Sequence, residues 1–124
     1  MDRSRLSIGK IGESLAIAHF KARGCKILAQ NYRVGRGEID LIVQDGQFIV
    51  FVEVKTRRSL KFGLPQEAVT RQKQKQISKI ALGYLKAENL WDAPCRFDVI
   101  GIHLSYQFEL LNLEHIESAF EFQR

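Results

Sequence analysis

A glutamate and a lysine two residues apart are the most chemically informative pair in this sequence. Glu53 and Lys55 follow residues 49–52, one of the longer apolar runs of the chain. Because side chains alternate between the two faces of a strand, both charged residues lie on the face that begins with Ile49 and Phe51. A buried face that becomes ionic within one strand is a candidate for a catalytic or binding site.

A second carboxylate stands on the strand that precedes this pair. Asp40 belongs to a strand that we predict over residues 38–44. The Asp-Gly dipeptide at 45–46 separates it from the strand predicted over 47–57, and this dipeptide is typical of a two-residue hairpin turn. The sequence therefore predicts a β-hairpin with one carboxylate on its first strand and the Glu-x-Lys pair on its second.

The register of this hairpin decides whether the two carboxylates meet. A turn at 45–46 places Asp40 opposite Phe51, and Glu38 then faces the glutamate of the pair. Asp40 and Glu53 become diagonal neighbours on one face, with Cα atoms ~7–8 Å apart, so that one ion can bind both. A register shift of one residue would turn them to opposite faces. The other face is predicted to be core and carries Ile39, Leu41, Val43, Val50, Val52 and Val54.

The oxygen ligands available on this hairpin predict a hard divalent cation, Mg²⁺ or Mn²⁺. They are the carboxylates of Asp40 and Glu53, the backbone carbonyl of Val54, and water, and no His or Cys is nearby in the sequence. Such an ion lowers the pKa of a bound water and holds a phosphate oxygen, as hydrolysis of a phosphodiester requires. Lys55 would orient or help to deprotonate the attacking water, or neutralise the charge that develops on phosphorus.

Two further charged residues occupy core-facing positions of predicted helices. Glu13 shares a helical seam with Ala16 and Phe20, and Lys73 stands four residues before Ile77. Buried charges are unfavourable unless they are paired or bound to a metal ion. We therefore expect both residues to belong to a site or to an ion-pair network, and exposure at a helix end is the alternative for each.

Helices and strands alternate in the elements that position these residues. Ser7 is a suitable N-cap for a helix that reaches Arg23, and Gly24 suits the left-handed turn that ends it. Apolar positions at helical spacing predict a second helix over 70–86. The other predicted elements are strands over 26–33, 96–104 and 107–113 and a short helix near Ile116 and Phe120. This order predicts a single α/β domain over residues 1–124 with helices packed on a sheet.

Basic residues are concentrated in one part of the chain. The net charge of +5 combines +10 over residues 1–87 with −5 over 88–124. Arg71, Lys75 and Lys79 recur every fourth residue and form one stripe on the second helix, which is either a solvated face or a surface for a polyanion. We expect a nucleic acid, DNA first, held through its phosphates. The residues expected to contact it are Arg57, Arg58, Lys61, Arg71, Lys73, Lys75 and Lys79.

Other features argue against membrane insertion and secretion. No apolar run approaches the ~20 residues that span a bilayer, and no apolar signal core follows the first residues. Cys25 and Cys95 are isolated, which argues against a disulfide scaffold or a zinc ribbon. We therefore expect a protein of the reducing cytoplasm.

The remaining titratable residues are assigned structural positions. His19, His103 and His115 lack the spacing of a metal site and are predicted to be surface or core residues. Asp98, two residues after Arg96, is predicted to be its structural partner.

The motifs above resemble a known family in their order and spacing. They are similar to the YraN-type family of small bacterial proteins, which is placed in the restriction-endonuclease-like superfamily near the archaeal Holliday junction resolvases. The resemblance extends over residues 8–103 and is carried by Gly12-Glu13, Asn31-Tyr32-Arg33, Gly37-Glu38-Ile39-Asp40-Leu41-Ile42, Phe51-Val52-Glu53-Val54-Lys55-Thr56-Arg57, Phe62-Gly63, Lys73 and Arg96-Phe97-Asp98-Val99. It implies a restriction-endonuclease-like mixed β-sheet flanked by helices, in the order α-β-β-β-α-β-β.

The same resemblance implies roles for individual residues. The metal-binding aspartate of the superfamily maps to Asp40, and its Glu-x-Lys pair maps to Glu53 and Lys55. The acid that resolvases carry on their first helix maps to Glu13, and an extra polar active-site residue of some relatives maps to Gln66. Resolvase relatives act as homodimers, because a four-way junction has two-fold symmetry, so a homodimer is also implied.

Our leading hypothesis is a Mg²⁺- or Mn²⁺-dependent nuclease that hydrolyses DNA, with branched DNA as a candidate substrate. Its expected catalytic residues are Glu13, Asp40, Glu53, Lys55 and Gln66, and its expected metal ligands are Asp40, Glu53 and Val54. The alternative is a non-catalytic nucleic-acid-binding module of the same fold. A third interpretation is a structural protein whose charge cluster is only a salt-bridge network.

Overall fold

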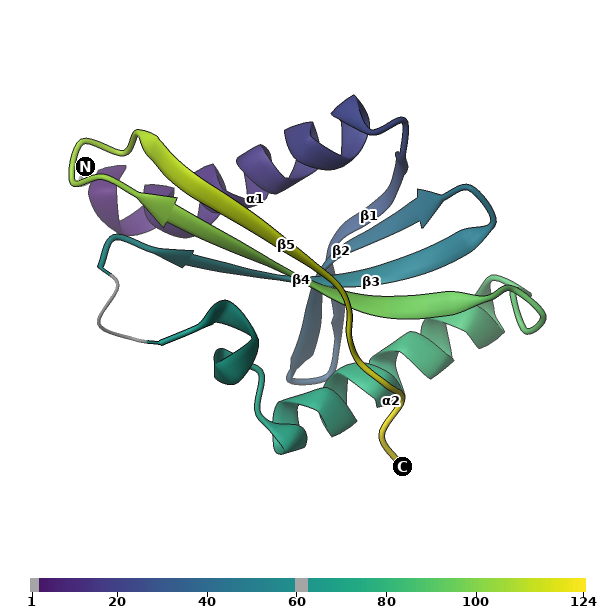
Figure 1. The fold of residues 1–124 in the computed structure, drawn as a ribbon. Coiled ribbons are helices and arrows are strands. Elements are labelled where there is room, and N and C mark those ends of the chain that lie inside the picture. The colour runs from purple at the N-terminus through teal and green to yellow at the C-terminus, as the bar shows by residue number, and fades with distance from the viewer. Residues whose placement is uncertain (1–2, 60–62) are drawn as a thin grey trace.

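The chain forms a twisted five-stranded sheet with a helix on each face. The structure, a computed structural model, describes residues 3–59 and 63–124. Figure 1 shows α1 (Arg3–Ala22) above the sheet and α2 (Arg71–Ala87) below it. The other described elements are β1 (Lys26–Val34), β2 (Gly37–Asp45), β3 (Phe48–Arg57), the 3₁₀ helix η2 (Pro65–Ala68), β4 (Cys95–Leu104) and β5 (Leu110–Phe120). The expected mixed α/β architecture, in the order α-β-β-β-α-β-β, is therefore confirmed.

The strands lie side by side in the order β1-β2-β3-β4-β5. Neighbouring strands are antiparallel except for β3 and β4, which are parallel. A parallel pair needs a long crossover connection, and α2 supplies it beneath the sheet. The crossover carries the basic helix across the sheet face on which Glu53 lies. Among the described residues, no helix is long and apolar enough to cross a membrane.

Each face of the sheet has its own core. The cluster beneath α1 includes the fully buried residues Leu41, Val43, Val50 and Val52, and half-buried Val54 packs against it. The cluster between the sheet and α2 includes Ile39, Ile42, Ile49 and Phe51. The core face predicted for β3 is thus confirmed, but Ile39 packs on the α2 side of the sheet and not on the α1 side with Leu41. Ile39 lies beyond Leu41, the last residue of β2 that pairs with β3, and strict alternation is not kept there.

Element boundaries differ from the sequence-based expectation at both ends of the chain. α1 begins at Arg3, before the expected cap at Ser7. The segment that contains Ile116 and Phe120 is not a helix but the second half of β5, and the strand expected over 107–113 begins at residue 110. A spacing of four residues fits both the helical and the strand period. Pairing with the free edge of β4 decides in favour of the strand.

Gly12 brings α1 close to β3. A Cβ atom built on Gly12 would overlap the hydroxyl of Thr56, whereas a Cβ on Gly9 of the same helix would meet no atom within 4 Å. Only a residue without a side chain permits this approach of helix to strand. The next residue, Glu13, is thereby held over the sheet.

We expect Gly12→Ala to destabilise the protein by about 1–3 kcal/mol, because the added methyl group overpacks the contact between helix and strand. Gly9→Ala is the matched control. It should be neutral or stabilising by about 0.5–1 kcal/mol, because alanine is the better helix former. Urea unfolding followed by circular dichroism measures both values. Equal effects of the two substitutions would contradict the close approach.

A buried network fastens β5 to β4 and to α1. Asp98 is fully buried and accepts hydrogen bonds from Nε of Arg96 at 3.0 Å and from the N–H of Ser118 at 3.1 Å. Its other oxygen lies 2.7 Å from Nε2 of His115, whose Nδ1 is 2.9 Å from Nε2 of His19. Burial alone would raise the pKa of Asp98, but the hydrogen bonds outweigh it and hold the pKa below its ordinary value. The expected pairing of Arg96 with Asp98 is confirmed, and two histidines far apart in the sequence belong to the same network.

Asp98→Ala should destabilise the protein by about 3–5 kcal/mol, because it leaves buried donors without their acceptor. The depressed pKa implies stability that is present above the unfolded-state pKa of ~3.9 and is lost as the pH falls through the lower folded-state value. The difference between wild type and variant should therefore shrink below about pH 4. Thermal melting across pH measures it, with exposed Asp92→Ala as a control expected within about 0.5 kcal/mol of wild type.

Candidate functional site

The hairpin of β2 and β3 turns one residue later than predicted. Pairing begins with Asp45 opposite Phe48 and ends at Leu41. The turn therefore starts at Gly46, whose φ of 60° suits the first position of a tight hairpin turn. The prediction of a turn at residues 45–46 was wrong because the glycine, and not the aspartate before it, takes the first turn position.

The corrected register places the two carboxylates at the end of the same ladder. Phe51 pairs with Ile42 and not with Asp40. The positions that follow the last pair of the ladder are Asp40 on β2 and Glu53 on β3, so the two residues face each other directly and not diagonally. The shift amounts to two positions along one strand, and because side chains alternate with a period of two, both acids stay on the same face. They lie where the two strands stop pairing, which we call the opening of the hairpin.

Asp40 occupies the opening between the two strands. Its Oδ2 accepts a hydrogen bond of 2.8 Å from the backbone N–H of Val54. Because the N–H and C=O of one strand residue point toward the same neighbouring strand, the Val54 carbonyl is directed to this side as well. Burial raises the pKa of Asp40, the Val54 N–H opposes the rise, and the charges of Glu13 and Glu38 add to it.

Glu53 is the most buried acid of the site. Its side chain is 3% exposed, and within the described residues Oε1 has no hydrogen-bond partner. Oε2 lies 3.6 Å from Nζ of Lys73. Burial, followed by the charge of Asp40, raises the pKa of Glu53 to about 7 against the opposing charges of Lys73 and Lys55. A buried carboxylate oxygen without a partner is an unused ligand position.

Glu13 completes the acidic group from the α1 side. Its side chain is 21% exposed, and both oxygens lie 3.3 Å from Nδ2 of Asn31 on β1. Asn31 has a φ of 49°, a left-handed conformation that is rare inside a strand and best tolerated by asparagine and aspartate. The charge of Glu13 also contributes to the raised pKa of Asp40, and its membership of the site stays a prediction. Sequence reasoning assigned no role to Asn31, although it belongs to the Asn31-Tyr32-Arg33 motif.

Two lysines face the carboxylates from different elements. Lys55 on β3 is half-buried, and burial followed by the charge of Lys73 lowers its pKa. Lys73 stands in the first turn of α2, where its backbone N–H donates to the capping hydroxyl of Thr70. The expectation that Lys73 belongs to a site or an ion-pair network is confirmed by its contact with Glu53, and its contact with phosphates stays a prediction.

The other predicted residues lie around this centre. Gln66 is exposed in η2, where its carbonyl accepts from the N–H of Val69. Arg57 donates to the carbonyl of Gly63 at 3.3 Å, and Arg58 donates to that of Tyr106 at 3.1 Å. The exposed members of the α2 stripe are Arg71, Lys75 and Lys79. The predicted contact residue Lys61 lies outside the described residues.

The donor set suits a hard divalent cation. It consists of the carboxylates of Asp40 and Glu53 and the carbonyl of Val54. Over residues 3–59 and 63–124, no group of three or more His, Cys, Asp and Glu side chains could hold a metal ion. Mg²⁺ is ordinarily held by one or two carboxylates together with water and substrate phosphates, so two acids suffice. The unpartnered Oε1 of Glu53 and the raised pKa values of both acids are the observations that fit a cation at this position.

Removing the charge of Glu53 should stabilise the metal-free protein at high pH. Because the pKa rises from 4.5 to about 7, the contribution of Glu53 to stability is fully present below about pH 4.5 and is lost as the pH passes through 7. Glu53→Gln, which cannot ionise, should therefore melt at a higher temperature than wild type at pH 8 in EDTA. The difference corresponds to about 3 kcal/mol and should vanish below about pH 4.

The control for this measurement is Glu88→Gln, an exposed acid at the end of α2. It should follow wild type within about 0.5 kcal/mol at both pH values. Parallel melting curves of wild type and Glu53→Gln across the same range would contradict the raised pKa.

Known proteins are similar to this chain over most of its length. Relatives from Geobacter metallireducens, Geotalea uraniireducens and Dictyoglomus turgidum are 51%, 49% and 46% identical to it. The alignments cover 93%, 93% and 91% of this chain and 93%, 90% and 96% of the relatives. Each of these proteins is described as a UPF0102 protein.

A solved structure and a family model are also similar to this chain. The structure of Pyrococcus furiosus SfsA in complex with Ca²⁺ is 12% identical, with 93% of this chain and 62% of that chain covered and a TM-score of 0.29, a likeness too low to support an argument. The family model of UPF0102 matches residues 12–102, the span that contains all five predicted catalytic residues. The chain therefore belongs to the Uncharacterised protein family UPF0102, the YraN-type family that its motifs resemble.

Proposed function

We propose that this protein is a metal-dependent nuclease that hydrolyses phosphodiester bonds in DNA. The observation that supports this function best is the pair of buried carboxylates at the opening of the hairpin, with a lysine beside them on the same strand. Glu53 is 3% exposed and retains an oxygen without a partner, which is unfavourable unless a ligand uses it. A salt-bridge network alone would have satisfied that oxygen.

Each residue at the opening has its own proposed role in hydrolysis. Asp40, Glu53 and the carbonyl of Val54 would hold Mg²⁺ or Mn²⁺, which when bound supplies Lewis-acid stabilisation of phosphate oxygens and lowers the pKa of a bound water. Lys55 would orient the attacking water, and its ammonium charge would stabilise the charge that develops on phosphorus; burial lowers the pKa of this group. Lys73 balances the charge of Glu53, from which it is 3.6 Å distant.

Glu13 has a supporting role on the other side of Asp40. Asn31 holds both of its oxygens, so the carboxylate has a fixed orientation over the opening. In that position it can hold a water molecule near the site or repel a phosphate that approaches from the wrong side. Gln66 would contact the substrate from η2, which connects β3 to α2.

The substrate would lie along α2. Arg71, Lys75 and Lys79 are exposed on this helix, whose first turn carries Lys73 into the site. Because the stripe lies on the side of α2 away from Lys73, a phosphate backbone that follows it would reach the carboxylates around the first turn of the helix. Binding through these charges would weaken steeply as the salt concentration rises. Nucleic acid, and DNA first, is the partner that this surface fits.

A panel of linear, flap and four-way DNA tests the proposed function. We expect cleavage in Mg²⁺ or Mn²⁺ and none in EDTA. Asp40→Asn and Lys55→Ala should each lower the rate by about 10²–10³-fold, because each removes a group that stabilises the charged transition state. The matched controls are Asp92→Asn and Lys26→Ala, which change exposed residues away from the proposed site and should retain the rate.

Two results would contradict the nuclease. One is the absence of cleavage of every substrate in both metal ions. The other is cleavage that survives Asp40→Asn. DNA binding that persists in EDTA without any turnover would instead favour the non-catalytic binding module.

A further inference from the structure

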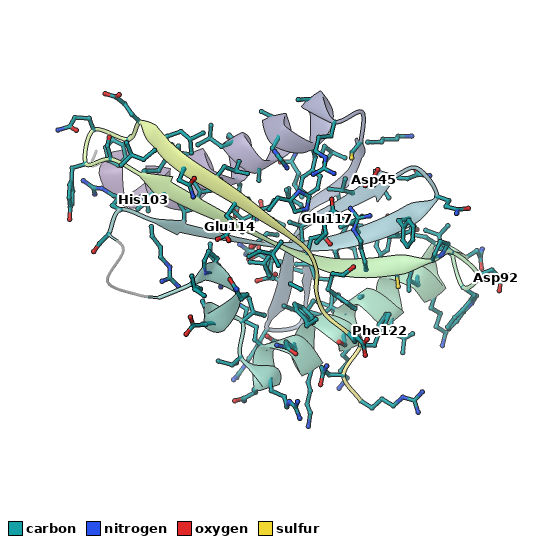
Figure 2. The ribbon with its side chains drawn as sticks, viewed as in Figure 1. Asp45, Asp92, His103, Glu114, Glu117 and Phe122 are labelled. Atoms are coloured by element: carbon teal, nitrogen blue, oxygen red, sulfur yellow. The ribbon has the colours of Figure 1, made fainter. Side chains whose placement is uncertain are left out.

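A hollow lies beside the proposed site on the same face of the sheet. Three strands form its floor in two rows of directly paired residues. In the first row, Lys55 pairs with Gly101 across β3 and β4, and Gly101 pairs with Glu114 on β5. In the second row, the corresponding residues are Arg57, His103 and Asn112. Figure 2 labels His103 and Glu114 on β4 and β5.

Gly101 lets η2 pack closely on the sheet. It places no side chain between Lys55 and Glu114, whose Cα atoms are two strand spacings apart, or about 10 Å, and the ring of Pro65 lies over it and bounds the hollow. η2 lies on the same side of the sheet, and a Cβ built on Gly101 would overlap the ring of Pro65. Leu64 lines the wall and is 52% exposed, a large apolar side chain without cover. The resulting cavity is about 120 Å³ in volume.

We propose that this hollow binds one unpaired guanine base that flanks the bond to be cleaved. This inference deepens the proposed nuclease function and rests on it for the position of the scissile phosphate. The cavity is far smaller than the ~300 Å³ at which pockets for drug-sized ligands begin, so it accommodates a single planar ring system. The base would lie against Leu64 and Pro65, which supply the apolar surface that an extruded base requires.

The polar groups of the hollow select guanine among the four bases. The carboxylate of Glu114 offers two acceptors side by side, and only guanine presents two adjacent donors, N1–H and the 2-amino group, on its Watson–Crick edge. The amide of Asn112, one row further along the strand, can donate to O6. Cytosine, adenine and thymine each present at most one donor next to an acceptor. They would leave a Glu114 oxygen without a partner.

The position of the hollow suits a base next to the reacting phosphate. Lys55 forms one wall of it and is also the proposed catalytic lysine. Glu53 lies one row away on β3, about 7 Å along the strand. A nucleotide bound at the carboxylates therefore places its neighbouring base within reach of Glu114. A paired base cannot enter, so the site would require single-stranded, flap or otherwise unpaired DNA.

Binding of short single strands in EDTA tests the pocket separately from cleavage. We would measure fluorescence anisotropy with labelled oligo-dT that carries one central dG, dA, dC or deoxyinosine, at one fixed salt concentration. Wild type should bind the dG strand about 5- to 100-fold more tightly than oligo-dT, the range provided by one bidentate base contact. Deoxyinosine lacks the 2-amino group and should lose most of this preference.

Glu114→Gln should abolish the preference, because an amide presents one acceptor and one donor in place of two acceptors. Glu109→Gln is the matched control. It removes the same charge from an exposed residue of the turn that precedes β5 and should retain the full ratio. The readout is the ratio of affinities for dG and dT strands, since loss of either negative charge raises the affinity for all DNA. Both variants should melt at the wild-type temperature.

Three results would overturn the guanine pocket. They are equal affinity of wild type for all four bases, a preference that survives Glu114→Gln, and failure to bind any strand. Guanine preference without cleavage would leave the pocket intact and reject only the nuclease. Cleavage without base preference would reject the guanine pocket and leave the nuclease function intact.

Discussion

The hydrogen bond from the N–H of Val54 to the carboxylate of Asp40 is the contact on which the site depends. A side chain there takes the place that a backbone carbonyl would occupy in a regular ladder. The pairing of the two strands consequently ends at Leu41 and Val52, at the edge of the buried core, and both acids lie at the opening that follows. Neither an exposed edge nor a continuous sheet would combine ion-binding oxygens with such low accessibility. The geometry therefore originates in one local failure of strand pairing.

The buried acids on the two faces of the sheet differ in their hydrogen bonding and in the direction of their pKa shifts. Asp98, on the α1 side, receives donors at both oxygens, and its pKa is depressed although burial would raise it. Glu53, on the α2 side, keeps an unpartnered oxygen, and burial raises its pKa to about 7. Buried acids whose oxygens are all hydrogen-bonded stabilise a fold. A buried acid with an unpartnered oxygen and a raised pKa marks a position where a ligand is expected. Within one small sheet, the pKa values thus distinguish a fully hydrogen-bonded acid from the acid of the candidate site.

Much of this arrangement could be predicted because it follows from local chemistry. The alternation of apolar and charged residues in β3 placed Glu53 and Lys55 together, and the Asp-Gly dipeptide identified the hairpin. What could not be predicted depends on tertiary contacts. The turn moved by one residue because Asp45 still pairs, and a helix expected at the C-terminal end became β5 because β4 offered a free edge. The roles of Asn31 and Gly101 were also missed, since a left-handed asparagine and a glycine beneath a proline ring have no signature in a single sequence.

The parallel pairing of β3 with β4 has a consequence for how the site is assembled. The β2–β3 hairpin is local in sequence and can form within ~1–10 μs, so its two acids meet early. Lys73 reaches them only after the crossover helix has docked and β4 has joined the sheet, and such non-local steps are slower. Until then the acids repel each other, and a proton on one of them relieves the repulsion. The charge balance of the site is thus a property of the completed topology, and partially folded chains should be unable to form it.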